Sequence, residues 1–366
     1  MFKNIYKSKK ILLTGHTGFK GSWMTKWLLH LGAEVVGISN KIPTKPSMFE
    51  ILELEKSINH LIIDIRNYND LKKIIEKEKP DFIFHLAAQA IVSTAYSEPL
   101  ETISSNVMGT ANLLEALRVL NYHCTAVIIT SDKVYNNIEK IFGYKESDEI
   151  GGKDIYSGSK GAAELVIKSY YESFFKNNSS KVRLAVARAG NVIGGGDWAK
   201  DRVVVDAVTS WSNNKIVEIR SPKATRPWQH VLEPLSGYLN LGMQLNNNKA
   251  LNGECFNFGP IEEDNKTVIE LLKDLSIYWD SELDNKKIII NENITFKEAT
   301  LLKLNCEKSH KLLNWQCSLG YKETIKYISE WYLSYYKRNT DMNKITTNQI
   351  FDYQKIAKSK SLEWTA

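Results

Sequence analysis

The chain has 366 residues, of which 43% are hydrophobic and 25% are charged, enough to bury one large core or two modest ones. Its net charge of +6 is small and spread along the sequence, which argues against a nucleic-acid partner. The sequence shows no signal-peptide pattern, no apolar run of membrane length and no CxxC spacing among its 4 cysteines. We therefore expect a cytoplasmic protein with free thiols, no membrane partner and no metal site.

The chain opens with a pattern typical of dinucleotide binding. A buried strand is predicted at Lys10–Thr14, a turn with Gly15, Gly18 and Gly21 follows, and an apolar helix runs over Ser22–Leu31. Backbone N–H groups of such a turn, together with the N-terminus of the helix, can approach a pyrophosphate. A glycine turn alone is weak evidence for nucleotide binding, but the strand before it and the helix after it favour a nucleotide cofactor.

Strands and helices then alternate along the first half of the chain. Apolar runs predict strands at Glu34–Ile38, Leu61–Ile63, Asp81–His85, Ala126–Thr130 and Val182–Ala187, with helices at 68–77, 100–120 and from Tyr156 onward. This alternation predicts an α/β fold with a doubly wound parallel sheet, which is Rossmann-like. Ligands of such folds bind at the carboxyl ends of the strands.

The end of the second strand leaves the choice of cofactor open. An NAD site usually has Asp or Glu there to bond the ribose hydroxyls, whereas this chain has Ser39-Asn40-Lys41. Asn40 could bond the hydroxyls, and Lys41 would suit the 2′-phosphate of NADP. The residues by themselves therefore allow either dinucleotide.

Two short segments carry groups suited to alcohol chemistry. Tyr156 and Lys160 stand at i and i+4, on one face of a helix. A lysine beside a tyrosine is expected to lower the phenol pKa, so that the tyrosine can accept a proton from an alcohol. Ser131, Asp132 and Lys133 follow a strand and supply a hydroxyl, an acid and an amine. Oxidation needs only one hydroxyl besides Tyr156 and Lys160, so the acid and the amine suggest a further reaction step.

In the second half of the chain, strands and helices no longer alternate regularly. A glycine-rich loop, Asn191–Trp198, is followed by mixed helical and extended patterns. We expect residues 1–193 to form the nucleotide-binding domain, with 226–258 returning to it. Residues 194–225 and 259–337 would form a smaller mixed α/β lobe for the substrate, and 338–366 a mobile polar tail.

Three long strings of residues, 15–23, 191–202 and 226–234, together with the Tyr/Lys pair, closely resemble the extended short-chain dehydrogenase/reductase family. Within it they are most similar to the CDP-glucose 4,6-dehydratases of bacterial deoxysugar synthesis. The resemblance spans about residues 10–335. It implies NAD as cofactor, CDP-glucose as substrate, a homodimer formed through the helices at 100–120 and 156–175, and a place in lipopolysaccharide O-antigen synthesis.

The resemblance also implies a set of site residues. The cofactor would contact Gly15, Thr17, Gly18, Phe19, Gly21, Asn40, Asp64, Ile65, Leu86, Ala87, Ala88, Gln89, Asn106, Tyr156 and Lys160, with Asp64 at the adenine. The nucleotide sugar would contact Asn191, Arg202, Arg226, His230 and Asn257. Arginine suits a diphosphate because its planar fork can hold two oxygens.

These assignments predict a redox-neutral dehydration to a CDP-4-keto-6-deoxyglucose. Tyr156 and Ser131 would serve oxidation at C4, while Asp132 protonates the leaving C6 hydroxyl and Lys133 removes the C5 proton. A nucleotide-sugar 4-epimerase would share the Tyr156–Lys160 pair but has no need of the acid and the amine. A dehydratase of another nucleotide-glucose is also compatible with these residues. A non-catalytic dinucleotide sensor would not need Tyr156, Lys160 or Ser131.

Overall fold

The centre of the molecule is a seven-stranded parallel sheet, seen in a computed structural model that describes residues 1–219, 221–260, 265–279, 288–290 and 301–366. The strand order is β11-β6-β5-β4-β1-β2-β3, so the chain winds outward in both directions from β1 and β4. The strands are β1 Lys10–Thr14, β2 Glu34–Ser39, β3 Asn59–Ile62, β4 Phe82–His85, β5 Cys124–Ile129, β6 Val182–Ala189 and β11 Cys255–Phe258. The predicted doubly wound parallel sheet is confirmed.

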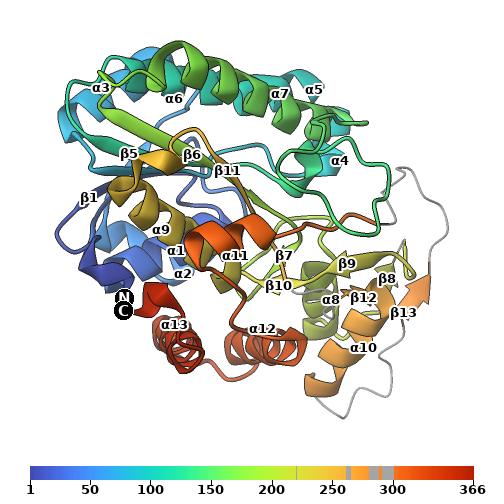
Figure 1. The fold of residues 1–366 in the computed structure, drawn as a ribbon. Helices are drawn as coiled ribbons and strands as arrows, with labels where there is room; N and C mark the ends of the chain where they lie inside the picture. Colours follow the sequence, from blue (N-terminus) through green and yellow to red (C-terminus); the bar gives the residue numbers. More distant parts are fainter. Residues whose placement is uncertain (220, 261–264, 280–287, 291–300) are drawn as a thin grey trace.

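Helices cover both faces of this sheet (Figure 1). One face carries α3 Tyr68–Glu78, α5 Pro99–Ile103, α6 Gly109–Arg118 and α7 Ile155–Tyr170, and the other carries α1 Phe19–His30 and α9 Leu232–Asn247. Side chains of β1 alternate between the two cores, since Ile11 and Leu13 enter one and Leu12 the other. Burial on both faces explains why the strands read as continuous apolar runs.

The helix predicted at 100–120 has the expected extent but is not a regular α-helix. Ser104–Met108 form a π-turn between α5 and α6, and α7 likewise continues into a π-turn at Tyr171–Phe175. Such turns are frequent at functional sites. The short helix α4, Val92–Ser97, precedes α5.

A smaller lobe of short strand pairs lies beside the sheet (Figure 1). Its elements are β7 Val192–Ile193 paired with β10 Gln229–His230, β9 Thr225–Pro227 with β12 Asn265–Thr267, β8 Val217–Ile219 with β13 Ile288–Ile290, and the helices α8 Val203–Ser212 and α10 Val268–Tyr278. Parts of the predicted substrate lobe, namely 261–264, 280–287 and 291–300, lie outside the described residues. Within the described ranges, none of the helices has the length and hydropathy needed to cross a bilayer.

The prediction of a mobile polar tail at 338–366 is wrong. After α11 Glu307–Leu313 and α12 Tyr321–Tyr336, the chain forms an eighteen-residue helix, α13 Met342–Ser359, which packs against α12 and α1. Its apolar side chains recur on one face, and Ile350 and Tyr353 are buried. Trp364 then stacks on Phe2, with ring centroids 5.0 Å apart, and the two termini lie side by side (Figure 1).

Candidate active site

A large cleft opens at the carboxyl ends of the parallel strands, between the sheet and the smaller lobe. Its volume of about 1180 Å³ exceeds the roughly 300–1,000 Å³ of a site for one small molecule. The cleft is lined by most of the predicted site residues: Gly15, Thr17, Gly18, Phe19, Gly21, Asn40, Asp64, Ile65, Leu86, Ala87, Ala88, Gln89, Ser131, Asp132, Lys133, Tyr156, Lys160, Asn191, Arg202 and Arg226. Segments distant in sequence are thus brought together around one space.

Two glycines of the loop, Gly15 and Gly21, have no room for a side chain. A Cβ atom on Gly15, whose φ is +75°, would lie 2.7 Å from the backbone nitrogen of Ala87. One on Gly21 would lie 2.1 Å from the carbonyl oxygen of Gly15. Gly18 is the N-cap of α1 and provides no side-chain cap, so the first N–H groups of the helix can bind an anion. The residues present therefore fit a dinucleotide.

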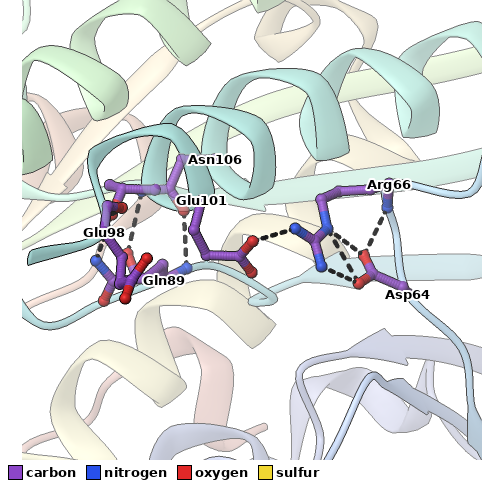
Figure 2. A network of polar contacts seen from close by, with 7 residues as sticks. Asp64, Arg66, Gln89, Glu98, Glu101 and Asn106 are labelled. Atoms are coloured by element: carbon purple, nitrogen blue, oxygen red, sulfur yellow. Dashed lines mark hydrogen bonds and ion pairs between the residues drawn. The ribbon is translucent and has the colours of Figure 1, made fainter. Parts of the chain in front are cut away.

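One end of the cleft carries a fixed carboxylate, Asp64, at the end of β3 (Figure 2). The Nε atom of Arg66 donates to both carboxylate oxygens at 3.0 Å, and its Nη1 atom pairs with Glu101 of α5. The hydrogen bonds from Arg66 are the main cause that lowers the pKa of Asp64, and one from Asn40 adds to them. Asp64 is therefore an ionised acceptor in a fixed orientation.

Asn106 supports this end of the cleft without lining it (Figure 2). Its Oδ1 atom accepts from the backbone N–H of Gln89 at 2.8 Å, and its Nδ2 atom donates to the Gln89 carbonyl and to Ser159. Asn106 lies in the π-turn and is buried. The expected direct contact of Asn106 with the cofactor is thus corrected: the residue holds Gln89 in place and ties it to α7.

The predicted acid and amine lie on a single turn at the end of β5. The Oγ atom of Ser131 accepts from the backbone N–H of Lys133 at 3.2 Å and donates to Oδ1 of Asp132 at 2.9 Å. Burial raises the pKa of Asp132, although Lys133 and the bond from Ser131 oppose this. A carboxyl group with a raised pKa can remain protonated and act as an acid.

Tyr156 and Lys160 face the same cleft from α7, whose first turn is capped by Asp154. Burial raises the pKa of Tyr156 to about 12, while a hydrogen bond from Ser131 lowers it. Burial also lowers the pKa of Lys160 to about 8, against the influence of Glu164. The expected lowering of the phenol pKa is therefore absent in the protein alone, because desolvation of the phenolate outweighs the hydrogen bond with Ser131 and the positive charge of Arg202.

Two predicted substrate contacts are not in the cleft. His230 is fully buried, its Nδ1 atom accepts from the backbone N–H of Leu232, and its ring packs against Trp23 and Tyr327. Asn257 is also fully buried and accepts from the hydroxyl of Tyr135. Both assignments are corrected: these residues support the fold around the site. By contrast, Arg202 lines the cleft and pairs with Asp197 at 3.1 Å.

Lys20 is a cleft residue to which the sequence analysis gave no role. It lies in the first turn of α1, between two predicted cofactor contacts, and its Nζ atom donates to the hydroxyl of Tyr238 at 3.4 Å. Burial lowers the pKa of Lys20 to about 7, and the positive charges of Arg202 and Lys160 add to the effect. The sequence does contain a hint of such a role, because Lys20 places an amine inside the glycine loop. Backbone N–H groups of the loop can bind phosphate without any amine.

Comparisons with known proteins show the family to which the chain belongs. The family described as GDP-mannose 4,6 dehydratase matches residues 12–328. A CDP-glucose 4,6-dehydratase of Salmonella typhimurium is 44% identical over 354 residues, covering 96% of this chain and 98% of that protein. A CDP-paratose 2-epimerase of Salmonella typhi is 26% identical and covers 88% of this chain and 98% of its own length.

Solved structures share the fold. A UDP-glucuronic acid 4-epimerase of Bacillus cereus, in complex with UDP-glucuronic acid and NAD, has a TM-score of 0.75 at 22% identity and covers 90% of this chain and 100% of that one. A dTDP-glucose 4,6-dehydratase of Bacillus anthracis, in complex with NAD, has a TM-score of 0.72 at 22% identity, covering 89% and 96%. From the family match and the full-length relative, the chain belongs to the nucleotide-sugar 4,6-dehydratases of the extended short-chain dehydrogenase/reductase family.

Proposed function

We propose that the chain converts CDP-glucose to CDP-4-keto-6-deoxyglucose and water. The observation that carries the proposal is the buried acid Asp132 and the amine Lys133 on one turn, facing the same cleft as Tyr156 and Lys160. An enzyme that only oxidises or epimerises at C4 would not need the first pair. The choice of CDP-glucose is supported by the relative that is 44% identical over nearly the whole chain.

The cofactor that fits this site is a nicotinamide dinucleotide, and we propose NAD. Gly15, Gly18 and Gly21 would hold its diphosphate, and the fixed carboxylate of Asp64 can accept a hydrogen bond from the adenine amino group. Asn40 is hydrogen-bonded to Asp64 and can reach ribose hydroxyls. When bound, NAD supplies the acceptor for the C4 hydride and later the donor of that hydride to C6.

The oxidation step would use the α7 pair and the hydroxyl of Ser131. Tyr156 takes the proton of the C4 hydroxyl as the hydride leaves C4, and the new C4=O double bond forms. Ser131 bonds the same oxygen and aligns it. Lys160 would favour the phenolate and would bond the ribose of the cofactor. Arg202 and Arg226, which also line the cleft, would hold the diphosphate of the sugar nucleotide.

Elimination then follows from the acidity of the C5 proton next to the new ketone. Lys133 removes that proton, the C5–C6 double bond forms, and the C6 hydroxyl leaves as water with a proton from Asp132. Hydride return to C6 and proton return to C5 complete the 6-deoxy product. The raised pKa of Asp132 suits the donor role, because an acid must hold its proton before the step.

Side-by-side turnover of CDP-, dTDP-, GDP- and UDP-glucose tests both the reaction and the base. We expect loss of water, seen by mass spectrometry of the sugar, and the highest kcat/KM with CDP-glucose. A tenfold preference for another nucleotide, about 1.4 kcal/mol of transition-state binding, would contradict the base assignment. Inversion at C4 with no loss of water would instead indicate a 4-epimerase.

We also propose that two copies of the chain form a dimer through α5, α7 and the two π-turns that follow these helices. These adjacent elements expose large apolar side chains to solvent in the single chain: Leu100, Ile103, Met108, Leu165 and Phe174. Exposed apolar groups that gather on neighbouring elements are typical of protein–protein contacts. The opposite side of α7 carries Tyr156 and Lys160, so such an interface would support the catalytic helix from behind.

A further inference from the structure

A buried ion pair outside the cleft joins β6 to α7. The Nε atom of Arg188 donates to the two carboxylate oxygens of Glu164 at 2.9 and 3.0 Å, and both side chains are only 2% exposed. Neither residue lines the cleft. Because desolvation offsets much of the attraction in a buried pair, net stability alone is a weak reason for such an arrangement. The function of the pair therefore depends on the neighbouring residues that it holds in place.

The pair reaches both ends of the catalytic segment, which we define as residues 130–135. At the first end, the hydroxyl of Thr130 donates to Glu164 at 2.5 Å. At the other end, Nη1 of Arg188 donates to the hydroxyl of Tyr135 at 2.8 Å, and the guanidinium group lies 4.8 Å from the centre of that ring. Ser131, Asp132 and Lys133 occupy the turn between these two anchors.

Tyr135 is fixed from a second direction by β11. Its hydroxyl donates to Oδ1 of Asn257 at 2.7 Å. Asn257 lies opposite Arg188 in the β11–β6 pairing, and its Nδ2 atom donates to two backbone carbonyls, at 2.8 and 3.0 Å. The Tyr135 hydroxyl thus both accepts and donates within a buried network, which restricts the end of the turn to one position.

We propose that Tyr135, held by Arg188, is a positioning residue that places Asp132 and Lys133 for elimination. The inference rests on the proposed dehydratase function. Of the residues proposed for oxidation, Tyr156 and Lys160 lie on α7 and Ser131 lies beside the Thr130 anchor, whereas Asp132 and Lys133 lie farther along the turn that Tyr135 ends. Loss of the Tyr135 hydroxyl should therefore disturb elimination more than oxidation, because a misplacement of about 1 Å can cost roughly 100-fold in rate.

Tyr135→Phe with CDP-glucose tests this directly. We expect kcat to fall by about 10- to 100-fold with little change in KM. In a single turnover, reduced nicotinamide should accumulate by absorbance, and the quenched sugar should be a 4-keto compound that retains its C6 hydroxyl. Exchange of the C5 proton with solvent deuterium should slow to a similar extent.

Tyr144→Phe is the matched control. Tyr144 stacks on Tyr135, with centroids 5.0 Å apart, lies in the same buried apolar cluster and also loses a bonded hydroxyl in this variant. Among the described residues, its hydroxyl bonds the loop residues Asn137, Ile138 and Lys140, and not Arg188. We expect this variant to lose similar thermal stability but to turn over at close to the wild-type rate without accumulating reduced nicotinamide.

Three outcomes would overturn the inference. One is wild-type turnover by Tyr135→Phe. Another is an equal loss of activity in both variants with no reduced nicotinamide, which would make Tyr135 merely structural. A third is accumulation of reduced nicotinamide in both. Failure of the wild-type chain to dehydrate any nucleotide-glucose is a separate result, because it contradicts the proposed function before either variant is measured.

Discussion

Asp132 and Lys133 are neighbours in sequence but differ in their exposure to the cleft. Asp132 is 4% exposed, whereas Lys133 is partly exposed. The buried carboxyl group can keep its proton, and the more open amine can approach the C5 hydrogen. The burial of Asp132 supports its proposed role as the acid, and the opening of Lys133 to the cleft is compatible with its proposed role as the base.

Replacing either residue should stop the reaction after oxidation. Asp132→Asn and Lys133→Met retain most of the side-chain volume and leave Tyr156 and Lys160 intact. We expect each to lower turnover by about 10²- to 10⁴-fold while reduced nicotinamide accumulates in a single turnover, with loss of C5 deuterium exchange most severe at Lys133. Release of dehydrated product at the wild-type rate by both variants would mean that the pair is misassigned.

Tyr156→Phe should block the earlier step. The substitution removes the proton acceptor at little cost in shape, so binding of cofactor and substrate should persist. We expect turnover to fall by about 10²- to 10⁴-fold with no reduced nicotinamide at any time, in contrast to the Asp132 and Lys133 variants. Near-native turnover in a stopped-flow assay would remove Tyr156 from this role.

His230 should make stability depend on pH. Burial lowers its pKa from 6.5 to about 3, so below pH 6.5 the unfolded chain binds a proton that the folded chain does not. Stability should therefore fall as the pH falls, by about 2 kcal/mol between pH 7 and 5 from this residue alone. His230→Asn, followed by urea unfolding, should reduce the pH dependence by that amount.

The predicted site residues that line the cleft do so for a shared physical reason. Gly15, Ser131 and Tyr156 lie at strand ends or at the start of a helix that meets them, where topology alone brings groups together. His230 and Asn257 differ because polar side chains in short strands can point into the core or into the cleft. Which way they point depends on long-range partners, such as Tyr135 for Asn257, that local pattern does not reveal.

At the level of elements, the C-terminal helix α13 shows how a polar sequence can still be anchored. Few of its residues are apolar, but these recur at three- and four-residue steps, and Asp341 caps its N-terminus. Trp364, just beyond the helix, is fully buried and stacks on Tyr353 and Phe2. The segment is polar on average, although it carries a narrow apolar stripe. The average composition therefore led to the prediction of a mobile tail.

Trp364→Ala tests this anchoring. We expect a loss of about 3–5 kcal/mol in the free energy of unfolding, because a large buried ring is removed and a cavity remains. Denaturant unfolding followed by circular dichroism would measure it. Lys355→Ala, at a side chain that is 78% exposed on the same helix, should cost less than about 0.5 kcal/mol. If both variants lower the free energy of unfolding by the same small amount, Trp364 does not anchor α13.

At the scale of the whole molecule, the strands β1, β2, β4, β5 and β6 were predictable because most of their side chains are buried. The seventh strand, β11, was harder, since only four residues of the later chain return to pair with β6. That return matters for function, because it brings Asn257 beside Arg188 and the end of the catalytic segment. Distant pairing of this kind is set by tertiary packing and leaves little local signal.

The exposed apolar surface of α5 and α7 gives the last prediction, which concerns assembly. Leu165 is 55% exposed and follows Tyr156 by nine residues, so at about 100° per residue it faces the opposite side of α7 from the catalytic tyrosine. In a two-fold dimer, a charge introduced at Leu165 would be buried twice. Leu165→Glu should therefore weaken dimerisation by roughly 3 kcal/mol or more, over 100-fold in Kd.

Sedimentation velocity can measure this, because one chain has a mass of 41.8 kDa. We expect the wild-type chain to sediment as a dimer and Leu165→Glu to shift toward the single chain. Ile277→Glu is the control, since Ile277 is 75% exposed but lies on α10, in the smaller lobe. If the two variants sediment alike, or if the wild-type chain is monomeric at micromolar concentration, the α5–α7 surface is not the dimer interface. Retained turnover by a monomeric Leu165→Glu would further show that each cleft works without a partner.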